Sequence, residues 1–75
     1  MKTIFQGRTV EISPYGDAIH FSIFNLQAEA HEGSIEIHRD LNPEASWESF
    51  FEGYEGHEEI IKLCQTLAQA VFHTL

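Results

Sequence analysis

The sequence is poor in basic residues, in cysteine and in long apolar runs. Only four Lys and Arg residues stand against twelve Asp and Glu residues, which gives a formal net charge of −8. Nucleic-acid binders neutralise phosphates with clustered Lys and Arg, and anionic membranes attract the same residues, so this balance argues against both ligands. It favours a protein partner with a basic surface, or simply a well-solvated acidic exterior.

The single cysteine, Cys64, cannot form an internal disulfide and fits a reducing compartment. Residues 1–8 lack the apolar stretch of a signal peptide, and no run approaches the roughly 18–20 apolar residues of a membrane span. We therefore expect a cytoplasmic protein. A chain of 75 residues predicts a single domain, residues 1–75, with a small core.

The first half of the chain, about residues 2–39, predicts strands. Polar and apolar residues alternate over residues 9–13, 18–24 and 34–39, and less regularly over 2–5. The turn signature Pro14-Tyr15-Gly16-Asp17 joins the first two of these into an antiparallel hairpin. The expected core side of the sheet consists of Val10, Ile12, Ile19, Phe21, Ile23, Ile35 and Ile37.

The second half predicts two helices, over about residues 43–53 and 57–74. Asn42 followed by Pro43 is typical of a helix start, and glycines at 53 and 56 are typical stop signals. Apolar residues recur with helical period in both segments. In the first these are Trp47, Phe50, Phe51 and Tyr54, and in the second Ile60, Leu63, Cys64, Leu67, Ala68, Val71, Phe72 and Leu75. The predicted fold is α+β: a three- to four-stranded antiparallel sheet followed by two helices packed on one face.

Catalytic motifs are missing from the sequence. No serine lies in a Gly-flanked turn of the nucleophile-elbow type, and the glycine patterns of phosphate and dinucleotide loops are absent. Cys64 falls in the apolar pattern of the last helix, where a free cysteine behaves as a small hydrophobe. We predict neither catalysis nor a cofactor.

None of the five histidines lies in a short metal-binding spacing with another His or a Cys. By strand alternation, however, His20 and His38 share the solvated face of the sheet with Glu11 and Glu36. Two imidazoles and a carboxylate would meet there if their strands were adjacent. We interpret them as ordinary polar surface and nominate no metal ligand.

Glutamates dominate the first predicted helix. Glu44, Glu48 and Glu52 recur every four residues and would stack about 6 Å apart along one helical face, with Glu55 close behind. Like charges at this spacing mildly destabilise a helix. The stripe would suit a basic patch on a partner, would imitate nucleic-acid phosphates, or would be a solvated face of an acidic protein.

A second candidate surface is the open sheet face with its turns. Tyr15 in the turn and Phe24 on the outward side of its strand are predicted to be exposed, and aromatic residues are favoured anchors at interface centres. His20 and Glu36 share this face. These four residues and the four glutamates above are our candidate partner-binding set.

The strands, then Arg39-Asp40-Leu41, Trp47, Ser49-Phe50-Phe51-Glu52-Gly53, the turn at Gly56 and a terminal helix resemble a family of phage proteins. The resemblance covers most of the chain. The family is the small sheet-plus-helix group of phage-encoded anti-CRISPR proteins that inhibit the type I-F CRISPR surveillance complex.

The resemblance implies a non-enzymatic protein that binds the repeated backbone subunit of that complex and keeps target DNA away. It also implies contacts from sheet-face and turn residues, with Tyr15 matching a contact tyrosine. Gln6 stands where the family has an aromatic residue, and Phe24 where it has an acidic one. We therefore expect a protein-binding inhibitor from a phage or mobile element. The alternatives are an antitoxin or immunity protein that neutralises a basic toxin or nuclease, and a small structural homo-oligomer such as a homodimer.

Overall fold

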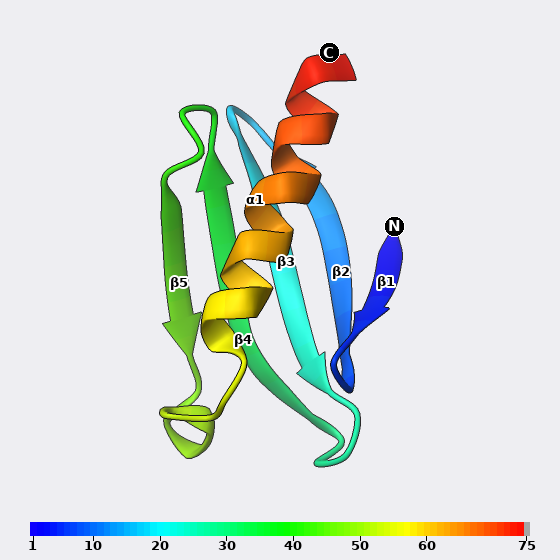
Figure 1. The fold of residues 1–75 in the computed structure, drawn as a ribbon, viewed down its shortest axis with the longest axis vertical. Coiled ribbons are helices and arrows are strands. Elements are labelled where there is room, and N and C mark those ends of the chain that lie inside the picture. Colours follow the sequence, from blue (N-terminus) through cyan, green and yellow to red (C-terminus); the bar gives the residue numbers. More distant parts are fainter. Residues whose placement is uncertain (75) are drawn as a thin grey trace.

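The computed structural model describes residues 1–74, which form one antiparallel sheet and one α-helix (Figure 1). The sheet has five strands in chain order, β1-β2-β3-β4-β5, and α1 lies across one of its faces. The elements are β1 (Lys2–Phe5), β2 (Arg8–Tyr15), β3 (Ala18–Asn25), β4 (Ala30–His38), β5 (Pro43–Trp47), the 3₁₀ turn η1 (Ser49–Phe51) and α1 (His57–Thr74). The predicted α+β class with helix on one face is confirmed.

The core lies between the sheet and α1. The seven apolar residues predicted for the core side of the sheet are all buried and pack against Ile60, Cys64 and Ala68 of α1. The period-two alternation of β2, β3 and β4 therefore identified the buried side correctly, because neighbouring side chains on a strand point to opposite faces. Each Å² of apolar surface removed from water stabilises a fold by about 25 cal/mol, so this buried inner face is the main source of stability.

The predicted helix over residues 57–74 is also confirmed. Gly56 precedes it with a φ of 93°, a conformation that favours glycine, and its carbonyl accepts the first helical bond from the Ile60 N–H at 2.9 Å. Glu58 and Glu59 lie in the first turn, where the helix dipole favours negative charge. Leu75, predicted for the apolar face, lies outside the described residues. Within residues 1–74, no helix has the length and apolar character needed to cross a bilayer.

The sheet has five strands where three or four were predicted, and the helix predicted over residues 43–53 is wrong. Residues 43–47 are strand β5, which pairs with β4 from Ile37 opposite Pro43 to Gly33 opposite Trp47. Asn42 is a turn residue and not a helix cap: its carbonyl accepts a hydrogen bond from the His38 N–H at 3.1 Å. Only the short turn η1 retains helical character in this segment.

Trp47 explains why the segment is extended. Its indole packs against Gly33 of β4, where a Cβ atom would collide with the ring, and it stacks on the His57 imidazole with centroids 3.6 Å apart. The four aromatic residues predicted to share one helical face therefore lie in two different places. Trp47 faces the inner side of the sheet, whereas Phe50, Phe51 and Tyr54 form their own cluster around η1 with centroids 4.9–6.2 Å apart.

The predicted glutamate stripe does not exist as a helical face. Glu44 lies in β5, Glu48 follows that strand and Glu52 follows η1. Extension of the backbone separates Glu44 from Glu48 by roughly 13 Å, which removes the repulsion that a helix would have imposed.

Candidate protein-binding face

None of the described elements covers the face of the sheet opposite α1 (Figure 1). Strand register places its outward residues in rows that cross the sheet. One central row is Lys2, Glu11, Ser22, Ser34 and Ser46, and the row beside it is Ser13, His20, Glu36 and Glu44. One outer row is Ile4, Thr9, Phe24 and His31. The other outer row is Tyr15, Ala18 and His38. We call this surface the open face. It is mixed in character, with aromatic residues at its ends and carboxylates and imidazoles between them.

The open face unites most of the predicted partner-binding residues. Tyr15, His20, Phe24, Glu36 and Glu44 all lie on it by register, and Glu48 adjoins it through a contact with His31 (Nδ1 to Oε1, 3.6 Å). Two candidate surfaces that the sequence separated, the sheet face and the glutamate stripe, thus become one. Glu52 and Glu55 lie elsewhere, in the exposed segment between η1 and α1.

Tyr15 and Phe24 differ in how they are presented. Tyr15 is 76% exposed beside the tight turn at Gly16, which has a φ of 62°. Phe24 is 39% exposed and, with Leu26, lines a shallow hollow that also includes Lys2, Thr9, Glu11, Ser22 and His31. The two aromatic residues are anchored on neighbouring strands roughly 20 Å apart, at a rise of about 3.3 Å per residue.

Charges on the open face are mainly negative. Lys2 supplies the basic group, and its Nζ lies 3.9 Å from Glu11 Oε2. Farther along, His38 Nε2 lies 2.8 Å from Glu44 Oε1 and 3.5 Å from Glu36 Oε1. We call Glu36, His38 and Glu44 the β4–β5 cluster. His20 lies opposite Glu36 but its ring is not part of this set of close contacts.

A second polar centre, which the strand pattern did not predict, lies on the inner side of the sheet. Glu32 is completely buried, and both of its oxygens accept hydrogen bonds from Arg8, at 3.0 Å from Nε and 3.1 Å from Nη2. Asn25 Nδ2 donates to the same carboxylate at 3.0 Å, and His57 Nε2 lies 2.6 Å from it. We call these four residues the Glu32 network. It ties β2, β3 and β4 to the first residue of α1.

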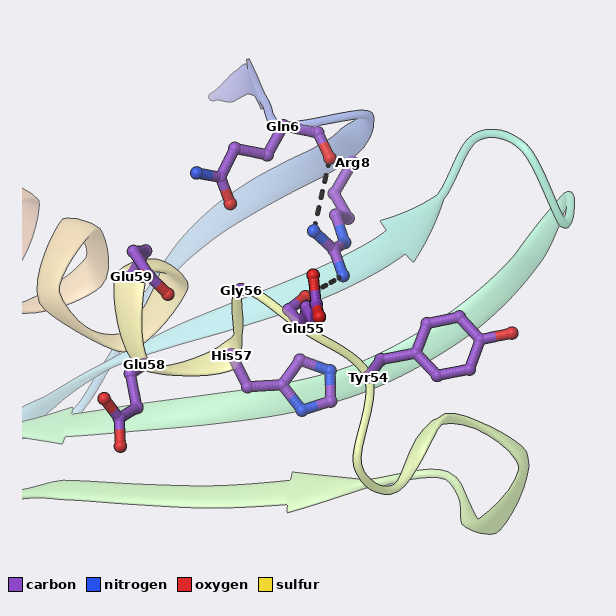
Figure 2. A pocket seen from close by; sticks show the side chains of 8 residues that line it. All are labelled: Gln6, Arg8, Tyr54, Glu55, Gly56, His57, Glu58 and Glu59. Carbon is purple, nitrogen blue, oxygen red and sulfur yellow. Dashed lines mark hydrogen bonds between the residues drawn. The ribbon is translucent and has the colours of Figure 1, made fainter.

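Figure 2 shows the mouth of this network, a shallow pocket between the β1–β2 turn and the start of α1. Arg8 reaches from β2 to the Glu55 carbonyl (2.9 Å) and to the Gln6 carbonyl (3.2 Å). The Tyr54 ring points away from His57. Desolvation alone would raise the pKa of Glu32, but the hydrogen bonds from Arg8, Asn25 and His57 and the charge of Arg8 outweigh it, so the pKa of Glu32 is below 4.5.

A β-bulge buries Glu32. Strand alternation from Ile35 would turn Glu32 outward, but the register shifts between Ile23 and Phe24, so that β4 has an extra residue there. Glu32 consequently faces inward while His31 keeps the outward position opposite Phe24. Arg8 and Asn25 were the available signal in the sequence, because both continue the inward phase of their strands and a buried Arg requires a partner.

The pocket beside the Glu32 network offers little for catalysis. Arg8 and His57 are both engaged by Glu32, and the residues lining the pocket include no Ser, Thr or Cys. Glu58 and Glu59 at its rim would repel an anionic substrate. Cys64 lies in the core, where burial raises its pKa to about 12 and so suppresses the reactive thiolate. The contacts of the Glu32 network and the buried position of Cys64 are those of structural residues.

No family model, curated protein or solved structure gives a significant match to this chain. The resemblance to anti-CRISPR proteins therefore stays a prediction, and the function has to be argued from the open face itself.

Proposed function

We propose that this chain is a non-catalytic inhibitor that uses its open face to occupy a basic, nucleic-acid-binding surface of a host protein complex. The observation that carries the proposal is the asymmetry of the fold: α1 covers one face of the sheet and leaves the other to solvent, with Tyr15, Phe24 and four carboxylates on it or at its edge. The carboxylates are Glu11, Glu36, Glu44 and Glu48. The resemblance to inhibitors of the type I-F surveillance complex names the partner to be tested.

The size of the open face suits such a role. A standard interface buries about 800 Å² on each partner, which is about one sixth of the 4870 Å² accessible surface of this chain. Only an extended surface such as a whole sheet face supplies that much area on so small a molecule. Carboxylates on the face would complement Lys and Arg that otherwise hold phosphates, raising both association rate and specificity.

The experiment measures displacement of target DNA from purified type I-F surveillance complex by increasing amounts of this chain. We expect stoichiometric inhibition that weakens between about 50 mM and about 500 mM salt, because exposed charges are screened over that range. Tyr15→Ala should weaken inhibition about tenfold or more if Tyr15 is an anchor.

Tyr54→Ala is the matched control. Tyr54 is the other tyrosine of the chain, is 41% exposed and lies next to η1, away from the open face, so its loss should leave inhibition unchanged. Inhibition that is indifferent to salt and to Tyr15→Ala would contradict the proposal. Failure to displace DNA at any concentration would rule out this complex as the partner.

A basic toxin or nuclease is the second candidate partner. Glu36 and Glu44, with Glu48 farther along the same edge of the sheet, would face its cationic active site as an immunity protein does. Co-expression with the product of a neighbouring toxin gene distinguishes the two: restored growth that depends on these glutamates favours the antitoxin function.

A further inference from the structure

The β4–β5 cluster brings together three potential metal ligands on the open face. Glu36 and His38 are two residues apart on β4 and therefore share a side of the strand, and Glu44 of β5 lies directly opposite Glu36. One ligand atom from each residue lies within 4.8 Å of the other two. Two neighbouring strands of a hydrogen-bonded sheet thus hold the three side chains at fixed spacing.

The local charge favours a cation. Two carboxylates flank one imidazole, and the nearest basic residue along the chain, Arg39, is turned to the other face, where its guanidinium lies 5.1 Å from the Phe72 ring. Both carboxylates of the cluster lie against the same His38 nitrogen, so a cation bound there would be flanked by two negative charges. His38 Nε2 lies 2.8 Å from Glu44 Oε1, and the same nitrogen would bind a metal ion when the imidazole is neutral and carries its proton on Nδ1.

We propose that Glu36, His38 and Glu44 form a binding site for a divalent transition metal of the zinc class. Two ligands on a tetrahedral ion with bonds of 2.0–2.2 Å lie about 3.4 Å apart. The distances from His38 Nε2 are 2.8 Å and 3.5 Å, so small rotations of the exposed carboxylates suffice to reach this geometry. An imidazole with carboxylates suits Zn²⁺, whereas Mg²⁺ and Ca²⁺ select oxygen ligands.

The site has an open fourth position. A hollow beside the cluster is lined by His20, Ser34, Glu36, Glu44, Ala45 and Ser46, which leaves room for water or for a ligand from a bound partner. Zinc sites with three protein ligands keep the fourth position for water or substrate, whereas structural zinc sites are closed by four protein ligands. The site lies on the surface that we propose for partner binding but does not depend on that function.

The test is isothermal titration of the full chain, prepared without a polyhistidine tag, with ZnCl₂ and separately with MgCl₂. We expect one Zn²⁺ per chain and no saturable binding of Mg²⁺. His38→Ala and Glu44→Gln should each weaken zinc binding about tenfold or more, since even loss of a residue behind a ligand weakens it that much.

His31→Ala is the matched control. His31 lies on the same face and strand but pairs with the single carboxylate of Glu48, so its loss should leave zinc binding unchanged. Circular dichroism checks that each variant is folded, and the exposed Glu44 can be changed with little risk to the core. Absence of a saturable zinc isotherm, or equal binding by His38→Ala and the wild type, would overturn the proposal. If the wild-type chain binds zinc but does not displace DNA from the surveillance complex, that result would count against the proposed function and not against the zinc site.

Discussion

At the scale of single residues, Glu32 is the polar group on which the inner side of the sheet depends. An ionised carboxylate in a core is tolerated only when it is paired and fully hydrogen-bonded. Glu32 meets this condition through Arg8, Asn25 and His57, and no buried side-chain nitrogen or oxygen of the described residues lacks a partner. The same geometry that protects the charge makes each partner hard to remove.

Glu32→Gln should destabilise the fold by about 3–5 kcal/mol, because it leaves the charge of Arg8 buried without its counter-ion. Urea denaturation followed by Trp47 fluorescence measures the loss. The double variant Arg8→Met/Glu32→Gln should recover part of it, since no unpaired charge remains. Glu59→Gln, at an exposed position, should stay within about 0.5 kcal/mol of the wild type. A loss for Glu32→Gln no larger than this would show that the network contributes little.

The sequence could indicate part of this network and could not give the rest. Arg8 and Asn25 are visible because they continue the inward phase set by Val10 and Ile23. Glu32 was hidden because a bulge, which depends on pairing between β3 and β4, reverses the phase of its strand locally. His57 was assigned only to the start of a helix, and nothing local to it predicts a contact twenty-five residues away.

At the scale of elements, the segments with long and regular patterns were predictable. Strands β2, β3 and β4 and helix α1 have apolar periods sustained over several turns or rungs, and each buries the predicted side. Residues 43–53 had only a short pattern, in which Asn42-Pro43 and four aromatic residues fitted a helix. Pairing with β4 overrode that preference, because it satisfies the backbone of β5 and places Trp47 over Gly33.

Gly33→Ala should destabilise the protein by about 1–3 kcal/mol, as is usual when a well-packed contact is overfilled. An added Cβ would lie 2.6 Å from the Ser46 carbonyl and would collide with the Trp47 indole, so β5 would have to move away from β4. Urea denaturation gives the loss, and Trp47 fluorescence should change because the indole would leave the His57 ring.

Ser34→Ala is the control for this substitution. Ser34 is the next residue of β4, points to the open face and lies between Ser22 and Ser46, so its stability should change by less than about 0.5 kcal/mol. Equal behaviour of the two variants would mean that Trp47 does not pack on Gly33, and would return the helical interpretation of residues 43–53 to consideration.

At the scale of the whole molecule, the two sides of the sheet are specialised differently. The inner side combines the apolar core with one fully satisfied ionic network, whereas the open face keeps its carboxylates, imidazoles and two aromatic residues accessible. The excess of acidic residues adds self-repulsion at neutral pH, when the formal net charge is −8. Stability therefore depends on pH through two contributions of opposite sign: the self-repulsion of the net negative charge and the ionised Glu32 in its network.

Stability should rise as pH falls from 7 toward the isoelectric point near 4.8, because the net negative charge of the folded chain shrinks and its self-repulsion weakens. Glu32 acts in the opposite direction. Its folded-state pKa is depressed, so its contribution is fully present above the ordinary value of 4.5 and is lost as pH falls through the lower folded-state value. The free energy of unfolding should therefore pass through a maximum at about pH 5 and fall at more acidic pH.

Urea denaturation from about pH 3 to about pH 8 at constant ionic strength measures this profile, and raising salt should flatten its neutral limb by screening the exposed charges. The acid limb should belong to Glu32. In the Arg8→Met/Glu32→Gln double variant, which has no carboxylate at this position to protonate, the decline below about pH 4.5 should become shallower while the neutral limb keeps its slope. An identical acid limb in both proteins would assign the decline to other carboxylates, and stability still increasing below that pH would contradict the depressed pKa of Glu32 itself.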